Sequence, residues 1–346
     1  MSLEGDPRAG ITSTVPVEAV FAADLVPVDL NNLFVADPDR STLIEMAHAE
    51  GFPQGSCAWI KGIYGAVRRE GIRRVIGVVR GDCSATAVLL EALELAGVTV
   101  LPFEYPASRD RDSMLAAIDA LCSSLGTGVD EAAPWLERLR PARKLLLELD
   151  GLCWREGKVS GLEDHTWLVS SSDFGSDPAA FESRLADFLE VAGQREPLDA
   201  RPLPYSREVR LAYIGVPPTT TDIFPRAEAT GARFVFCEVQ RQFSMPSAVM
   251  ASATPGELAE TYLQYTYPYS VSGRALDINV ECARRDVDGI VHYVQSFCFR
   301  NLEDAVFSRL LDRPVLTLEC DCPGELSAQA RSRLDNFIQV LGENIQ

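Results

Sequence analysis

The sequence predicts an α/β protein with two domains, each a parallel β-sheet flanked by helices, and a helical insert between them. Three observations carry this prediction. The chain has 346 residues, and at about 150 residues per domain this length suggests two hydrophobic cores. Short apolar runs alternate with helical patterns in both end regions of the chain, as in α/β folds. The middle of the chain shows mainly helical patterns.

The first domain is expected to span residues 1–107. Residues 75–79 form a buried-strand run of Val, Ile and Gly. Residues 84–97 follow with apolar residues at helical spacing and a glycine at the end, and residues 98–101 return to a strand pattern. This β-α-β succession is typical of the parallel sheet of Rossmann-like and flavodoxin-like domains, which have helices on both faces.

The insert and linker are expected to span residues 108–205. Helical patterns cover residues 114–125, 132–149 and 178–192, with charges on one face. The proline-rich residues 197–204 suit a linker that ends the insert.

The second domain, residues 206–346, repeats the alternation of strand and helix. Its segment 249–272 contains four tyrosines and gives no clear element, and we expect those tyrosines to pack in the core. The predicted elements are strand 209–216, helix 222–231, strand 232–239, helix 275–285, strand 289–295, helix 302–311, strand 314–318 and helix 327–341.

Charge and missing motifs exclude several function classes. Acidic residues outnumber basic ones 50 to 32, giving a net charge of −18, so neither nucleic acid nor an anionic membrane is an expected partner. The N-terminus is acidic and no apolar stretch approaches the ~20 residues of a membrane span, so we expect a cytoplasmic protein. The sequence has no phosphate-binding loop, no dinucleotide fingerprint and no nucleophile elbow.

The cysteines are the candidate ligands. There are nine cysteines and three histidines, and without an export signal the cysteines are expected to be thiols rather than disulfides. Histidine and cysteine spacings typical of zinc sites are missing, so a bound metal would be held by sulfur.

Three cysteines stand where a loop enters a predicted helix: Cys57, Cys83 and Cys298. Cys83 and Cys298 each follow a predicted parallel strand, at the edge where ligands bind in such sheets. The N–H groups at a helix start favour a thiolate. The alternative for each is a small core side chain, since free cysteine is among the most buried residues.

The other cysteines do not stand at positions that suggest a ligand role as clearly. Cys122, Cys153 and Cys282 are interpreted as core or surface residues. The roles of Cys237, Cys320 and Cys322 stay open. Cys320 and Cys322 are two positions apart, so on an extended segment their side chains would share a face. The neighbouring carboxylates Glu319 and Asp321 are interpreted as solvated strand-end charges.

Ordered motifs along nearly the whole chain match those of one known family. Residues 15–28 are similar to that family's opening "P-x-E-L-I-x-A-A-G-x-x-P-V". The remaining matches are Cys57 with Lys61 and Gly65, residues 81–84, residues 159–161, residues 287–292, Phe297-Cys298, residues 313–321 around "P-x-L-x-L-E-x-D", and residues 329–337. Through these segments the chain resembles the 2-hydroxyacyl-CoA dehydratase family, which includes benzoyl-CoA reductase subunits, and within it the D-component type of 2-hydroxyglutaryl-CoA dehydratase subunit.

The resemblance implies a cofactor and a reaction. In such proteins one cysteine from each of three matched segments holds a [4Fe-4S] cluster with one iron left open, so Cys57, Cys83 and Cys298 are the implied ligands. An ATP-dependent iron–sulfur activator delivers one electron, which passes to the thioester carbonyl of a (R)-2-hydroxyacyl-CoA. The substrate radical expels the 2-hydroxyl group, an enoyl-CoA forms and the electron is recycled. No catalytic side chain is assigned.

Two alternatives stay beside this one. Cys320 and Cys322 also fit relatives that hold a double-cubane cluster, and these or benzoyl-CoA-reductase-like proteins act as low-potential reductases. The family's enzymes pair two related subunits as homodimers or heterodimers, so this chain is alternatively a non-catalytic scaffold subunit.

Overall fold

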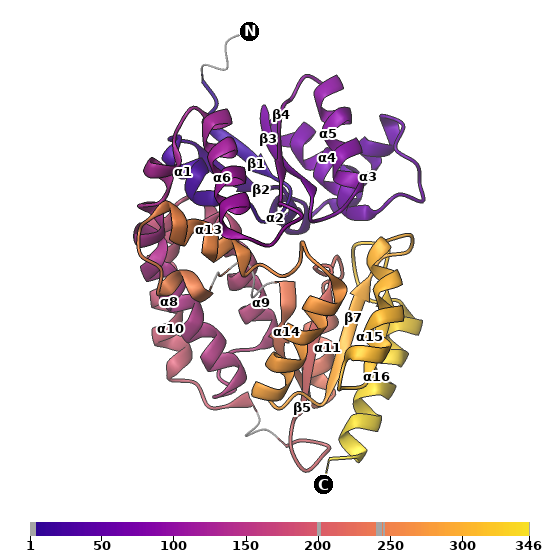
Figure 1. The fold of residues 1–346 in the computed structure, drawn as a ribbon. Helices are drawn as coiled ribbons and strands as arrows, with labels where there is room; N and C mark the ends of the chain where they lie inside the picture. Colours follow the sequence, from indigo (N-terminus) through magenta and orange to yellow (C-terminus); the bar gives the residue numbers. More distant parts are fainter. Residues whose placement is uncertain (1–4, 199–201, 240–243, 245, 346) are drawn as a thin grey trace. The chain divides into compact units, whose positions relative to one another are not determined.

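The computed structural model describes residues 5–198, 202–239, 244 and 246–345, and its chain forms two compact units (Figure 1). Neither unit is continuous in sequence. Unit 1 comprises Met1–Lys144, Ser170–Ser183 and Phe243–Tyr269, and unit 2 comprises Leu145–Val169, Arg184–Gln242 and Ser270–Gln346. Of the predicted linker 197–204, residues 199–201 lie outside the described part.

Each unit is built on one sheet of four parallel strands, which confirms the predicted fold class. The strands of unit 1 are β1 (Arg8–Ile11), β2 (Val26–Asp29), β3 (Arg74–Arg80) and β4 (Thr99–Glu104), in the order β2-β1-β3-β4. The strands of unit 2 are β5 (Val209–Gly215), β6 (Ala232–Cys237), β7 (Gly289–Val294) and β8 (Val315–Glu319), in the order β6-β5-β7-β8.

The helices of unit 1 begin and end at recognisable residues. Asp110 accepts a hydrogen bond from the Ser113 N–H at the start of α6, and Gly126 ends that helix in the left-handed region. Gly71 ends α4 in the same way. The helices are α1 (Val17–Ala22), α2 (Leu30–Ala36), α3 (Arg40–Ala49), α4 (Ala58–Glu70), α5 (Ala85–Leu95), α6 (Arg111–Leu125), α7 (Val129–Ala132) and α13 (Pro255–Leu263), with short 3-10 turns η1 (Ser170–Ser172), η2 (Phe174–Ser176) and η4 (Pro246–Val249).

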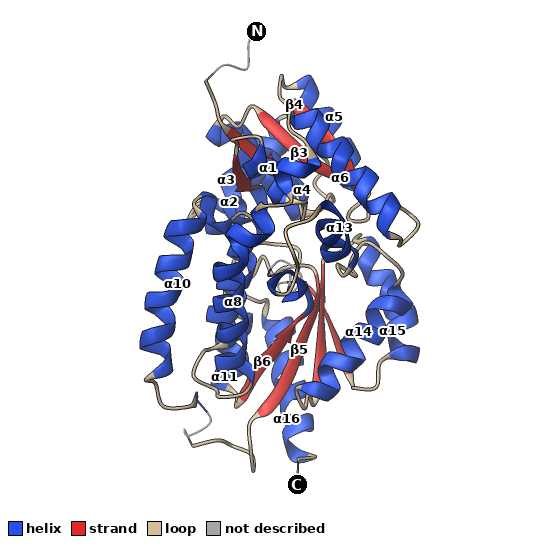
Figure 2. Cartoon of the chain, turned by 60° about the vertical axis from the view of Figure 1, so that its left-hand side comes forward, coloured by secondary structure: helices blue, strands red, loops and turns tan. Residues whose placement is uncertain are grey.

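Unit 2 carries helices on both faces of its sheet. Figure 2 shows α14 and α15 flanking the strands drawn as red arrows. The helices are α9 (Gly161–Val169), α11 (Ile223–Ala229), α14 (Val271–Arg284), η5 (Phe299–Glu303), α15 (Asp304–Leu310) and α16 (Ala328–Glu343), while α8 (Trp135–Trp154) and α10 (Pro178–Gly193) belong partly to each unit. In the described residues between β4 and β5 the regular elements are all helices, as expected for a helical insert.

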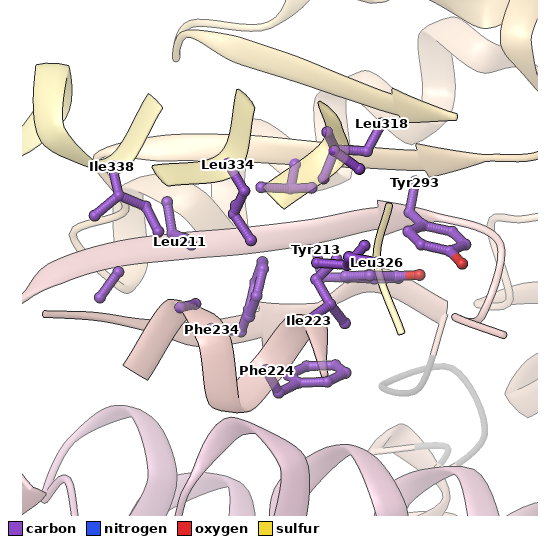
Figure 3. Packing of buried hydrophobic residues seen from close by; sticks show 14 of the residues in the cluster. Leu211, Tyr213, Ile223, Phe224, Phe234, Tyr293, Leu318, Leu326, Leu334 and Ile338 are labelled. Carbon is purple, nitrogen blue, oxygen red and sulfur yellow. The ribbon is translucent and has the colours of Figure 1, made fainter. Parts of the chain in front are cut away.

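The core of unit 2 follows the alternation of side chains along its strands. Leu211 and Tyr213 of β5 pack with α11 and α16 on one face, as Figure 3 shows for this cluster. Ala212 and Ile214 pack with α14 and α15 on the other. Because both faces are buried, the strands read as continuous apolar runs in the sequence.

Several elements were not predicted from the sequence, including the helices α1, α2, α3, α7 and α9. The strands β1 and β2 and the helix α13 were also not predicted, and α13 lies in the segment 249–272 that gave no clear element. Thr254 accepts a hydrogen bond from the Glu257 N–H at the start of α13, and Tyr262, Tyr265 and Tyr267 are buried as expected. Within the described residues, no helix has the length and apolar character needed to cross a bilayer.

Candidate functional site

Both sheets have the same strand order, with the second strand first, then the first, third and fourth. In such a sheet the chain leaves the first and third strands in opposite directions, and the carboxyl ends of those two strands frame the usual ligand position. Cys83 follows the end of the third strand of sheet 1, Arg80, by three residues. Cys298 follows the end of the third strand of sheet 2, Val294, by four residues. The two cysteines thus hold corresponding positions in their own units.

Cys57 directly precedes α4 and is its N-cap residue. The turn-rich loop before it is held by Lys61, whose buried ammonium donates to the Gln54 carbonyl at 2.9 Å and lies 3.2 Å from His48 Nε2. One turn later, a Cβ on Gly65 would lie 2.2 Å from the Leu43 carbonyl oxygen, so only glycine lets α3 approach α4 this closely. The packing of α4 on α3 therefore explains Gly65, and the contact with the preceding loop explains Lys61.

Cys83 ends a tight loop between β3 and α5. Gly81 in that loop has φ +95°, and a Cβ there would meet Pro268 at 2.6 Å and Tyr105 at 2.8 Å. The Tyr105 hydroxyl donates to the Thr14 carbonyl at 2.9 Å, which fixes the tyrosine side chain that packs against Gly81. The Thr86 N–H donates to the Cys83 carbonyl at 3.1 Å as the chain enters α5.

Cys57 and Cys83 belong to unit 1 and pack at the border of one hydrophobic cluster. The buried part of this cluster is formed by residues of α4, β3 and α5, including Ile60, Val75 and Leu89. The structure therefore places the first two predicted ligands, Cys57 and Cys83, against the same hydrophobic cluster of unit 1.

Cys298 belongs to unit 2 and is the N-cap residue of η5. Its N–H donates to the Gln295 carbonyl at 3.0 Å, and its own carbonyl accepts from the Asn301 N–H at 3.0 Å. Burial raises the pKa of the Cys298 thiol, and the nearby Arg300 guanidinium and backbone N–H oppose that rise.

A buried ion network underlies the Cys298 segment. Arg274 donates to both carboxylate oxygens of Glu238, at 2.7 and 2.8 Å, and to Glu303 Oε2 at 2.5 Å. Arg300 donates to Glu303 Oε1 at 3.0 Å. Two cations and two carboxylates thus balance, which burial requires. The network leaves no recognisable pattern in the sequence because its residues are scattered along the chain.

A buried histidine, His292, joins β7 to the start of α15, the helix that follows Cys298 and η5. The fully buried His292 of β7 lies with its Nδ1 2.6 Å from Asp304 Oδ1, at the start of α15. Thr317 of β8 donates to the other oxygen of Asp304 at 2.6 Å. His292 therefore acts as an anchor between strand and helix.

Burial separates the nine cysteines, all of which lie in the described part of the chain and none of which forms a disulfide. Cys57, Cys83 and Cys298 are the half-buried ones. Burial raises the pKa of Cys122 and Cys282 to about 12 and that of Cys320 to about 11. Burial also raises the pKa values of Cys153 and Cys237 well above the ordinary thiol value, so all five thiols stay protonated at neutral pH.

Cys320 and Cys322 do not share an environment. β8 ends at Glu319, so the alternation expected for an extended segment stops before them. Cys320 is buried and Cys322 is exposed.

Among the residues that the structure describes, no three His, Cys, Asp or Glu side chains converge as ligands of a single metal ion. A cubane iron–sulfur cluster does not require its ligands to converge on one metal ion, because each cysteine binds a separate iron. Half-buried thiols at helix starts fit such a cluster, since the N–H dipoles offset the negative charge of a thiolate-ligated cluster.

Comparison with known families decides the classification. The model of the 2-hydroxyglutaryl-CoA dehydratase D-component family matches residues 12–341. The chain belongs to this family. No protein with a curated description matches the chain significantly. Membership supports a dehydratase-type subunit and agrees with the resemblance found in the motifs. The matched range contains Cys57, Cys83 and Cys298.

Proposed function

We propose that this chain is the iron–sulfur subunit of a 2-hydroxyacyl-CoA dehydratase-like enzyme, a hydro-lyase that converts (R)-2-hydroxyacyl-CoA into enoyl-CoA. One observation carries the proposal. The three cysteines in the family's ligand segments are the three half-buried cysteines of the chain, and each stands at or just before the start of a helical segment.

Cys57, Cys83 and Cys298 would hold a [4Fe-4S] cluster, leaving one iron without a protein ligand. When bound, the cluster supplies a single electron at low potential to the substrate thioester carbonyl. The chain's own residues position the thiols. Lys61 fixes the loop before Cys57, and the Arg274 network fixes the segment after Cys298.

The reaction is redox-neutral overall: the hydroxyl group and a proton leave as water, and the electron returns. The sequence has no phosphate-binding loop, which fits a separate ATP-using protein as the source of the low-potential electron. We propose an ATP-dependent iron–sulfur activator as the electron donor. A related second subunit or a second copy of this chain would complete the enzyme, which would work in the cytoplasm.

An anaerobic assay tests this function. The chain, with its related subunit where one is encoded, would be mixed with an activator, ATP, a low-potential reductant and (R)-2-hydroxyglutaryl-CoA or another (R)-2-hydroxyacyl-CoA. Mass spectrometry should detect the enoyl-CoA, and its formation should stop without ATP. Cluster-loaded protein that forms no enoyl-CoA from any of these substrates would contradict the proposal.

Iron content separates the alternatives. About four irons per chain supports the dehydratase-type cluster, whereas about eight supports a double-cubane reductase. The double-cubane alternative rests on Cys320 and Cys322, whose burial differs. Iron absent after anaerobic isolation would favour a scaffold subunit.

A further inference from the structure

The end of β8 lies beside the point where the chain leaves β7 toward Cys298. In the parallel register Val294 pairs with Glu319, and the Cys320 N–H donates to the Val294 carbonyl at 2.9 Å. Glu319 is the last residue of β8, and Asp321 follows two positions later. Both carboxylates therefore leave the sheet next to the loop that carries Cys298.

These carboxylates bond the loop on both sides of the cysteine. Asp321 Oδ1 accepts from the Ser296 N–H at 2.6 Å, and Glu319 Oε1 accepts from the Ser296 hydroxyl. Glu319 Oε2 accepts from the Asn301 amide at 3.2 Å. Ser296 precedes Cys298 by two residues and Asn301 follows it by three, so Glu319 spans the loop. The two carboxylates are not merely solvated strand-end charges, as the sequence suggested.

The loop needs such a restraint. Phe297, directly before Cys298, has φ +61°, a left-handed conformation that is unfavourable for a residue with a Cβ. Its side chain is 90% exposed, so burial of the ring does not stabilise this conformation. Strained backbone persists where surrounding contacts hold it, and the contacts to Glu319 and Asp321 are such contacts.

We propose that Glu319 and Asp321 are positioning residues that hold the Cys298 loop in one conformation, so that the thiol is preorganised before the cluster binds. This inference rests on the proposed function for its cluster, but the loop restraint itself is a property of the metal-free chain. It assigns a role to the two acidic residues of the "L-E-x-D" block.

The test uses the full-length, metal-free chain under anaerobic conditions. Hydrogen exchange and the rate of iodoacetamide alkylation of Cys298, both resolved by mass spectrometry, would be measured for a variant with Glu319→Ala and Asp321→Ala. Glu325→Ala is the matched control, because this exposed carboxylate follows the same strand and pairs with Arg331 at 3.0 Å. We expect exchange in 296–301 and alkylation of Cys298 to rise roughly tenfold in the double variant, as for lost charge-assisted hydrogen bonds, and to stay unchanged in the control.

A conservative variant distinguishes positioning from charge. Glu319→Gln with Asp321→Asn keeps acceptor oxygens for Ser296, and its amide can pair with a turned Asn301 amide. This variant should restore slow exchange and, after reconstitution, the wild-type electron paramagnetic resonance spectrum, whereas the alanine variant should show a broadened or weakened spectrum.

The outcomes separate the two proposals. Wild-type exchange and alkylation rates in the alanine variant would overturn the positioning role, whatever the iron content. Iron that survives Cys298→Ser would instead contradict the proposed function, because that measurement does not depend on the loop restraint. Since Glu319 and Asp321 are exposed, we expect the variants to fold. The single variant Asp321→Ala repeats the test with one contact removed.

Discussion

Arg274 and Glu238 form a fully buried ion pair joined by two hydrogen bonds, at 2.7 and 2.8 Å. Glu238 directly follows β6, and Arg274 lies in the first turn of α14. The pair therefore locks a strand end to a helix start in unit 2. The fold depends on both partners being present, because either charge alone would be buried without a compensating charge.

Glu238→Gln should consequently destabilise unit 2 by roughly 3–5 kcal/mol. Urea unfolding followed by circular dichroism would measure the loss. The control is Asp335→Asn, which breaks the partly exposed pair with Arg226 and should cost far less, because solvent screens such pairs. Equal losses in the two variants would show that the buried pair carries no special weight.

Two buried carboxyl groups of unit 1 predict a pH-dependent stability. Asp173 Oδ2 accepts from the Asp29 N–H at 2.7 Å, and the Ser172 hydroxyl donates to Asp29. Burial, and then the Asp29 charge, raises the pKa of Asp173 to about 7, and burial also raises the pKa of Asp29. The folded chain thus binds protons more strongly than the unfolded chain, so this contribution to stability falls as the pH rises from about 4 through about 7.

Asp173→Asn removes one of these titrations. The variant should gain stability relative to the wild type as the pH rises through that window, even if a lost hydrogen bond costs it about 1 kcal/mol at low pH. Urea unfolding at several pH values between 4 and 8 would measure the difference. Parallel stability curves would show that Asp173 has an ordinary pKa.

Gly81 should tolerate no side chain. Gly81→Ala combines an unfavourable φ of +95° with a Cβ that would lie 2.6 Å from Pro268 and 2.8 Å from Tyr105. Gly97→Ala is matched in backbone, with φ +85° and no atom within 4 Å. The control should cost about 1 kcal/mol and Gly81→Ala roughly 1–3 kcal/mol more, seen as a larger fall in melting temperature. A similar fall for both would mean that the loop before Cys83 yields easily.

Lys61 should matter for the loop before Cys57. Lys61→Met keeps the apolar stem but removes the donor to the Gln54 carbonyl, leaving that acceptor unsatisfied at a cost of about 1–3 kcal/mol. Hydrogen exchange in residues 51–57 should accelerate. Lys144→Met, at an exposed lysine, should change nothing. Unchanged exchange in the Lys61 variant would mean that the loop is held by other contacts.

The strands from β3 to β8 could be predicted because burial on both faces makes each a run of apolar residues, and the helices between them show helical spacing. β1 escaped prediction because its four residues, Arg8–Ile11, include an arginine and a glycine and form no such run. It is a strand because its neighbours β2 and β3 supply hydrogen bonds on both sides. α13 carried a usable signal, a Thr254 cap followed by Pro255.

Some features of the candidate site could likewise be predicted from the sequence, and others could not. The positions of Cys83 and Cys298 after strands could be predicted, since strand ends are visible in the sequence. The contacts of Glu319 with Ser296 and Asn301 could not, because they depend on the register between β7 and β8. The Arg274 network likewise joins residues from three separate segments. Exposed or scattered charges give no periodic signal.

The most direct test of the account is iron and acid-labile sulfide analysis of anaerobically purified protein. The wild type should hold about four irons per chain, and Cys57→Ser, Cys83→Ser and Cys298→Ser should each lose most of them. Cys122→Ser, which changes a buried thiol outside the matched segments, should keep the wild-type content. Iron that is absent from the wild type, or that survives all three ligand substitutions, would contradict the assignment of these cysteines to a cluster.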